Sequence, residues 1–166
     1  VRDGTRVNSA DESNNDFTVI AAPTVTVSAP ANASEHTIET AMAITWSVRG
    51  LSIDHVDIGY WDDTDNSNTI NGAESVTSID ANESRGSSET ADAYSGKYTG
   101  NYTWTIPSDA TVSQTLKLRV RGYDSSNNLL ATAYSSWHFR IKGGFQFRDE
   151  NTSSNVFSPA ASMADW

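Results

Sequence analysis

Six segments of this chain alternate apolar and polar residues with a period of two, and this alternation restricts the possible folds more than any other feature. A β-strand points successive side chains to opposite faces, so each segment is typical of a strand with one buried face. The pattern is clearest in 42–48, where one face receives four large apolar residues. The six predicted strands are 24–28, 42–48, 55–61, 101–106, 115–123 and 137–141.

No window of a dozen residues keeps a helical period, and Ser, Thr, Asn, Asp and Gly fill the segments between the predicted strands. The sequence therefore predicts an all-β fold, an antiparallel β-sandwich of the immunoglobulin-like or fibronectin-like kind. A turn at 124–128 is expected to join two strands as a hairpin, and a weaker strand is expected at 75–79. The aromatic side chains expected in the core are Trp46, Tyr102, Trp104 and Trp137. The basic side chains expected to face water are Lys117, Arg119 and Arg121.

Residues 1–20 are similar to residues 120–141 in the order of their features. Both begin with Val-Arg, pass through a turn rich in Asp, Ser and Asn, and end in a strand that contains Phe. The offset between them is close to the length of one sandwich domain, roughly 100 residues. We therefore predict three segments. They are 1–22 as the terminal strands of a preceding repeat or a donor strand, 23–142 as the sandwich, and 143–166 as a C-terminal extension or the start of a next segment.

The chain is acidic and contains no cysteine. Its formal net charge is -10, with 11 Lys and Arg among 166 residues. Such a charge disfavours nucleic acid and anionic membrane surfaces as partners. No apolar run approaches the roughly 18 residues of a membrane span. Without cysteine no disulfide and no thiolate metal site can form, which favours a prokaryotic surface protein, or a large domain that needs no disulfide, over a small secreted eukaryotic domain.

Several strand motifs together resemble a known family. They are Ile-Thr-Trp-Ser-Val at 44–48, Val-Asp-Ile-x-Tyr at 56–60, Tyr-x-Trp-Thr-Ile-Pro-Ser at 102–108, Leu-Arg-Val at 118–120 and Phe-Arg-Ile at 139–141. This order is similar to the Ser-Thr-rich, Kre9/Knh1-type β-sandwich domain of yeast cell-wall proteins and of bacterial and archaeal surface proteins. The resemblance implies a tandem, non-catalytic role at the cell surface and supplies no catalytic residue. The chain departs from the family in its long polar segment after the third predicted strand and in its C-terminal tail.

The polar segment contains a twelve-residue stretch, 63–74, that matches much of a calcium-binding loop. Calcium takes six to eight oxygen ligands, and loops of this length supply them from alternate positions. Two features depart from the motif: Asn68 stands where a glycine makes the sharp turn, and a strand instead of a helix precedes the loop. The alternative is an acidic hairpin loop that stays solvated. The candidate ligands are Asp63, Asp65, Ser67, the Thr69 carbonyl, Asn71 and Glu74.

Two sets of surface residues could interact with sugars. Trp61 falls on the outward face of its predicted strand, and with Tyr94 and Tyr98 it could stack on a glycan. The alternative is an aromatic that covers the long loop or meets a neighbouring subunit. Asn-x-Ser/Thr sequons, which accept glycans only in an exported protein, occur at Asn32, Asn82, Asn101 and Asn151.

Catalysis finds little support in the sequence, and an enzyme is not expected. The histidines His36, His55 and His138 lack the spacing of a metal pair, and there is no nucleophile elbow or phosphate loop. Asp62 and Asp63 are adjacent carboxylates, but no apolar pocket is evident that would separate their pKa values.

The preferred function is structural: an extracellular repeat, adhesin stalk or filament subunit at the cell surface. Its expected partners are copies of itself or adjacent repeats, since an unpaired strand can add to a neighbouring sheet. The competing prediction is a carbohydrate-binding module that recognises cell-wall or surface glycans. No cofactor is required, with calcium as the one candidate. The expected assembly residues are Phe17, Val19, Phe145, Phe147, Phe157 and Trp166.

Overall fold

The computed structural model describes residues 22–50, 52–72, 74–90 and 96–144, and within these ranges the chain is all-β, with ten strands and no helix. The strands are β1 (Thr24–Ala29), β2 (Glu35–Thr37), β3 (Ala41–Arg49), β4 (His55–Asp62), β5 (Thr77–Ser84), β6 (Ser87–Thr90), β7 (Lys97–Thr105), β8 (Ser113–Tyr123), β9 (Leu129–Tyr134) and β10 (Phe139–Lys142). The predicted residues that lie outside the described ranges are Phe17, Val19, Tyr94, Phe145, Phe147, Asn151, Phe157 and Trp166.

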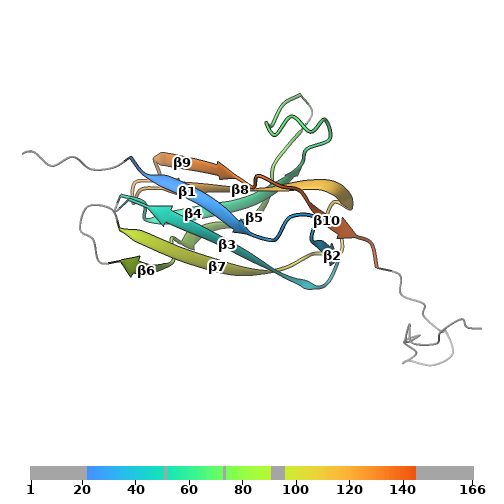
Figure 1. The fold of residues 1–166 in the computed structure, drawn as a ribbon, viewed down its shortest axis with the longest axis horizontal. Coiled ribbons are helices and arrows are strands. Elements are labelled where there is room, and N and C mark those ends of the chain that lie inside the picture. Colours follow the sequence, from blue (N-terminus) through green and yellow to red (C-terminus); the bar gives the residue numbers. More distant parts are fainter. Residues whose placement is uncertain (1–21, 51, 73, 91–95, 145–166) are drawn as a thin grey trace, which may run out of the picture.

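The strands form two sheets that pack against each other (Figure 1). One sheet has the order β1-β3-β7-β6, and the other has the order β2-β10-β8-β4-β5. Both β9 and β10 pair with β8, β9 along its C-terminal half and β10 along its N-terminal half. The segment 135–138 between them therefore lies beside the middle of β8, where Ser135 donates its backbone N–H to the Leu118 carbonyl at 2.8 Å.

The core lies between the two sheets and confirms the alternation read from the sequence. Every second residue of β3 is buried, and the same is true of the inward positions of β8. Trp46 is fully buried and lies on Gly100 of the neighbouring β7; a Cβ at position 100 would be 2.3 Å from Trp46 Cε2. Only glycine therefore leaves room for this indole at the centre of the sheet.

Three strands were not predicted, and two predicted strands, at 75–79 and 137–141, begin two residues later than expected. The strands β2, β6 and β9 are short or only partly buried, so they show little of the alternation on which the prediction rests. The last strand begins at Phe139. Trp137 precedes it in a loop, half-buried, and donates from Nε1 to the Pro30 carbonyl at 2.6 Å, so its placement in the core was wrong.

The predicted turn at 124–128 is confirmed and connects β8 to β9. Asp124 accepts the backbone N–H groups of Ser126 at 2.9 Å and of Asn128 at 2.8 Å, and Asn127 has a φ of 61°. Asn is one of the few residues that adopt this left-handed conformation readily.

The described chain enters the fold at one end of its long axis and leaves it at the other (Figure 1). The strand β1 begins at the entering end, and β10 ends at the opposite one. Among the described residues, no helix has the length and apolar character needed to cross a membrane.

Candidate functional site

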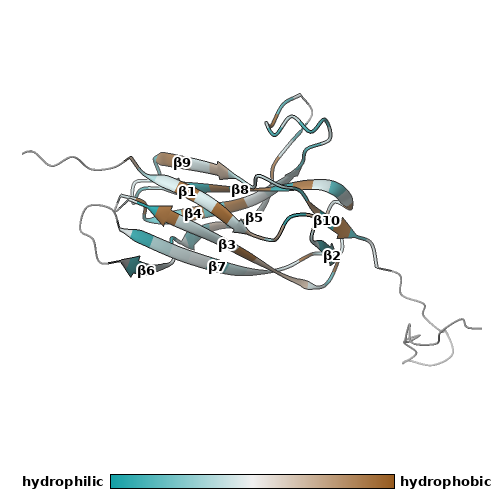
Figure 2. Ribbon diagram, viewed as in Figure 1, coloured by the Kyte–Doolittle hydropathy of each residue, from teal (hydrophilic) through white to brown (hydrophobic). Residues whose placement is uncertain are grey.

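The loop that follows β4 lies over the outer face of the second sheet and begins with a buried aspartate. Asp63 is 0% exposed, and its backbone N–H donates to the Thr115 carbonyl of β8 at 3.0 Å. Figure 1 shows this loop projecting from the end of β4, and Figure 2 colours most of it hydrophilic. The loop is thus mostly polar but anchored by a carboxylate that water does not reach.

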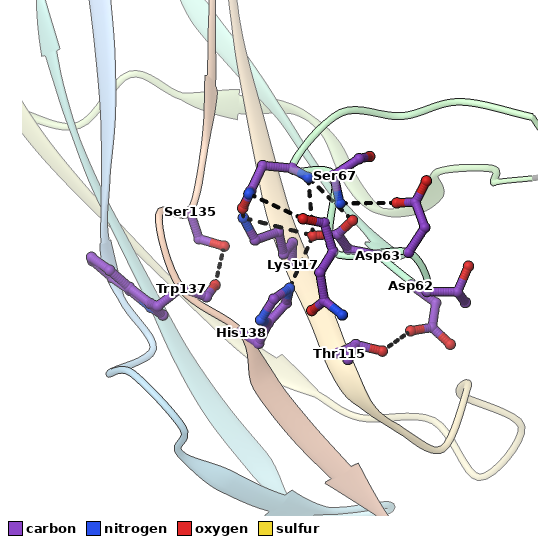
Figure 3. Close-up of polar contacts among 12 residues, drawn as sticks. Asp62, Asp63, Ser67, Thr115, Lys117, Ser135, Trp137 and His138 are labelled. Atoms are coloured by element: carbon purple, nitrogen blue, oxygen red, sulfur yellow. Dashed lines mark hydrogen bonds and ion pairs between the residues drawn. The ribbon is translucent and has the colours of Figure 1, made fainter.

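Three groups surround the Asp63 carboxylate (Figure 3). His138 Nε2 lies 2.9 Å from Oδ2, and the backbone N–H of Asn68 donates to both carboxylate oxygens at 3.3 Å. The Lys117 ammonium lies 3.9 Å from Oδ2 and is itself only 1% exposed. A buried carboxylate is costly unless it is paired and hydrogen-bonded, and Asp63 is both. We call Asp63, Lys117, His138 and Asn68 the buried polar cluster, after its two fully buried charged residues; His138 is half-buried and Asn68 is exposed.

Two predictions about the outer face of the second sheet were wrong. Lys117 does not face water, and Trp61, its cross-strand partner on β4, is only 1% exposed. The Trp61 ring packs edge-on against Tyr134 of β9, with ring centroids 5.1 Å apart. The alternation was read correctly, because both residues do point outward, but the loop after β4 and the segment 135–138 cover that face. Arg119 and Arg121, also expected to face water, are half-buried.

The structure gathers several of the predicted calcium ligands. Carboxylate oxygens of Asp63, Asp65 and Glu74 all lie within 4.8 Å of one another. Asp65 accepts hydrogen bonds from Asn71 Nδ2 at 3.1 Å and from the Ser67 backbone at 2.9 Å, and these bonds lower the pKa of its carboxyl. The Ser67 hydroxyl donates to the Thr69 carbonyl at 2.9 Å.

The same groups are also used within the protein. Glu74 accepts the backbone N–H groups of Thr64 at 3.0 Å and of Asn71 at 3.2 Å, which closes the loop on itself. At Asp63 the Lys117 ammonium already supplies a positive charge, and a second cation in contact with the carboxylate would be repelled by it. Calcium binding by this loop stays a prediction.

The two predicted glycan-stacking residues that the structure describes, Trp61 and Tyr98, do not form an exposed platform. Trp61 is buried, and Tyr98 is half-buried beneath the Arg85 guanidinium, which lies 4.0 Å from its ring centroid. A cleft of about 300 Å³ opens between the loop and the start of β5. Its two aromatic residues, Tyr60 and Trp61, are 3% and 1% exposed, so neither offers a flat face to a sugar.

The remaining candidate residues, which are the sequon asparagines, Asp62 and two histidines, do not belong to the buried polar cluster. Of the sequons within the described ranges, Asn32, Asn82 and Asn101 are all exposed, as an acceptor requires. Asp62 accepts the hydroxyls of Ser113 at 2.8 Å and Thr115 at 2.6 Å, so it is bound to β8 and does not pair with Asp63. His36 and His55 lie outside the buried polar cluster, on β2 and β4.

Sequence reasoning missed the contacts of Lys117 with Asp63 and Asn68. A signal was present: Lys117 stands between Leu116 and Leu118 on a central strand whose cross-strand partner is Trp61. A long polar loop that starts with aspartate beside such a lysine points to a covered outer face. The sequence does not show how the loop after β4 is aligned with β8. The loop residue that contacts Lys117 could therefore not be named.

Comparisons with known proteins add little to this description. No protein-family model matches the chain, and no curated protein matches it. Among solved structures, the chain is similar to the crystal structure of Spo0M, a sporulation control protein from Bacillus subtilis, with a TM-score of 0.45 and 10% sequence identity. The match covers 74% of this chain and 50% of that chain, so this chain spans about half the length of its relative. The strands and contacts described above by themselves define an all-β, two-sheet domain with a buried polar cluster on one outer face.

Proposed function

We propose that the domain is a non-catalytic, extracellular structural module with an immunoglobulin-like sandwich fold, used as a tandem surface repeat or as a filament or adhesin subunit. The observation that supports this best is the placement of the start of β1 and the end of β10 at opposite ends of the long axis (Figure 1). Modules whose connections lie at opposite ends can be joined end to end. A stretching force applied to such a chain acts parallel to the strands.

The two terminal strands are attached in a way that suits this load. β1 pairs with β3 along its length, and β10 pairs with both β8 and β2. A pull parallel to a strand shears its ladder, so all of its hydrogen bonds bear the load together instead of opening one at a time. Glu35 adds ion pairs with Arg140, at 3.2 Å, and Lys142 across the β2–β10 pair.

The proposed partners are neighbouring copies of the chain or adjacent repeats. The resemblance to Ser-Thr-rich surface domains and the likeness of residues 1–20 to residues 120–141 support this. In the first sheet, β1 and β6 are the edge strands, and edges of this kind accept an added strand. Segment 1–22, with Phe17 and Val19, is the proposed donor.

Immunogold electron microscopy of intact cells that express the protein tests this role. We expect label on external stalks or filaments, with more than one copy along each. Label confined to the cell interior would overturn the proposal, and so would single, unassociated molecules in the medium. The carbohydrate-binding alternative has lost its main support because Trp61 is buried.

A further inference from the structure

The side chains of Lys117 and Asn68 meet inside the buried polar cluster in an arrangement suited to covalent chemistry. Lys117 Nζ contacts the side-chain carbonyl oxygen of Asn68. We propose that these two side chains are joined by an intramolecular amide bond, formed after folding with release of ammonia, and that Asp63 carries the proton during its formation. The bond would connect the loop after β4 to the centre of β8.

The geometry places an amine nitrogen next to an amide carbon. The carbonyl carbon of Asn68 is one bond, about 1.23 Å, from the oxygen that Lys117 contacts. The other side-chain atom of Asn68, Nδ2, donates to the Asn66 carbonyl at 3.4 Å, so the amide plane is held at both ends. Asn68 has a φ of 60°, and its backbone N–H binds Asp63, which fixes the residue over the carboxylate.

The amine and the carboxylate of this site are shielded from water, whereas Asn68 is exposed on the loop. Lys117 is 1% exposed and Asp63 is 0% exposed, and Trp61, the cross-strand partner of Lys117 on β4, is 1% exposed. Holding two reacting groups in contact replaces a bimolecular encounter by a unimolecular step.

The reaction balances with the groups present. The Lys117 ammonium gives a proton to the Asp63 carboxylate, and the free amine attacks the Asn68 amide carbon to form the new C–N bond. Asp63 moves protons from Nζ to Nδ2, the bond between the amide carbon and Nδ2 breaks, and ammonia leaves as ammonium. One ammonium and one primary amide become one secondary amide and one free ammonium, and Asp63 ends as a carboxylate. No oxidant, reductant or metal is needed.

Such a bond would supply a covalent cross-link to a chain that has no cysteine. It would close a loop between residues 49 apart in sequence and hold the polar loop onto the sheet. The proposed amide bond does not depend on where the protein is located. A test of the bond is therefore independent of a test of the proposed structural role.

The intact mass of the purified, denatured wild-type protein tests the proposal. We expect a mass lower than the sequence mass by one ammonia. Because trypsin does not cleave after an acylated lysine, digestion should give a branched peptide that joins the segment around Lys117 to the segment around Asn68. A mass equal to the sequence mass, or ordinary cleavage after Lys117, would overturn the proposal without any variant.

Three variants locate the bond and its proton carrier. Asn68→Ala and Asp63→Asn should each restore the full mass expected for their sequences while the far-UV spectrum stays that of a β-protein. Asn66→Ala is the matched control in the same loop, at a φ of 56°, and should still lack one ammonia. If Asn68→Ala retained the mass deficit, the bond would lie elsewhere and the assignment would be wrong.

A succinimide at Asn71, which precedes Gly72, would cause the same loss of ammonia and must be distinguished. A succinimide opens in mild alkali and gains one water, whereas a secondary amide keeps its mass under that treatment. A deficit that disappears in alkali would therefore refute the cross-link, and one that persists together with the branched peptide would establish it.

Discussion

The loops after β4 and after β8 both begin with an aspartate that accepts backbone N–H groups, yet their environments differ. Asp63 binds the N–H of Asn68 and is fully buried, whereas Asp124 binds those of Ser126 and Asn128 and remains partly exposed. Both loops also contain an asparagine with positive φ, Asn68 at 60° and Asn127 at 61°. The local turn chemistry is therefore alike, and the difference arises from what covers each loop.

That difference shows how an ordinary turn residue acquires a special environment. The turn after β8 ends in solvent, so its aspartate does no more than satisfy nearby N–H groups. The loop after β4 folds back over a strand that carries an outward lysine, and the covering converts a surface turn into a buried polar cluster. Four predictions test how far the two loops differ.

The largest effect is expected from removing the aromatic cover of the longer loop. Trp61→Ala should lower the free energy of unfolding by about 3–5 kcal/mol, because it removes a large buried side chain. Its ring partner Tyr134 is 44% exposed, so Tyr134→Ala should cost about 1 kcal/mol. Urea denaturation of both variants measures this. A stable Trp61→Ala protein that lost retention on a polysaccharide would instead favour the glycan-binding role.

Replacing the two asparagines of positive φ gives the most direct comparison of the loops. Asn68→Ala should cost about 4 kcal/mol if it opens a covalent loop between residues 49 apart, on the chain-entropy estimate. Asn127→Ala removes the same backbone preference without a cross-link and should cost about 1 kcal/mol. Denaturant unfolding under identical conditions measures the pair. Equal losses would mean that Asn68 is only a turn residue.

The inner faces of the sheets were predictable from sequence because their pattern is local. Residues such as Trp46 and Leu118 alternate with polar neighbours, and the structure buries both completely. The turn at Asp124 was equally clear, because its hydrogen bonds join residues no more than four apart. In both cases the residues that determine the local structure lie within a few positions of one another in the sequence.

The outer face of the second sheet could not be predicted in the same way. Period two states that Lys117 points away from the core, but it does not state whether a loop covers that face. The covering groups come from Asp63 and Asn68, far upstream, and from His138, downstream. Local alternation is equally weak for β9, whose Leu129 is 52% exposed, and that strand was missed for this reason.

The partly exposed aspartate, Asp124, should contribute a small, acid-sensitive stabilisation. Hydrogen bonds from the Asn128 side chain and backbone lower the pKa of Asp124 below its ordinary 3.8. The unfolded chain therefore takes up a proton first as the pH falls, so this stability is present above 3.8 and is lost as the pH falls through the folded-state pKa. Asp124→Asn should reduce the drop in Tm between about pH 5 and about pH 3 by about 2 °C.

Thermal melts followed by circular dichroism measure this change. Asn128→Ala is the matched variant, because it removes the side-chain hydrogen bond that contributes most to the shift. It should flatten the acid response in the same direction as Asp124→Asn. A steeper loss of stability in either variant would contradict the assignment.

The smallest effect is expected from calcium, and it decides which description of the longer loop holds. An amide between Lys117 and Asn68 and a calcium ion bound to Asp63 would exclude each other. Lys117 Nζ lies 3.9 Å from the Asp63 carboxylate, so the lysine and the ion would occupy the same space. A chelator or added calcium should therefore leave Tm unchanged within about 1 °C. If the loop does bind calcium, a free calcium concentration of about a hundred times the Kd would stabilise the fold by about 2.7 kcal/mol. A thermal melt detects a change of this size easily. Such a rise, abolished by Glu74→Gln, would show that Asp63, Asp65 and Glu74 hold a metal and that Lys117 does not occupy the site.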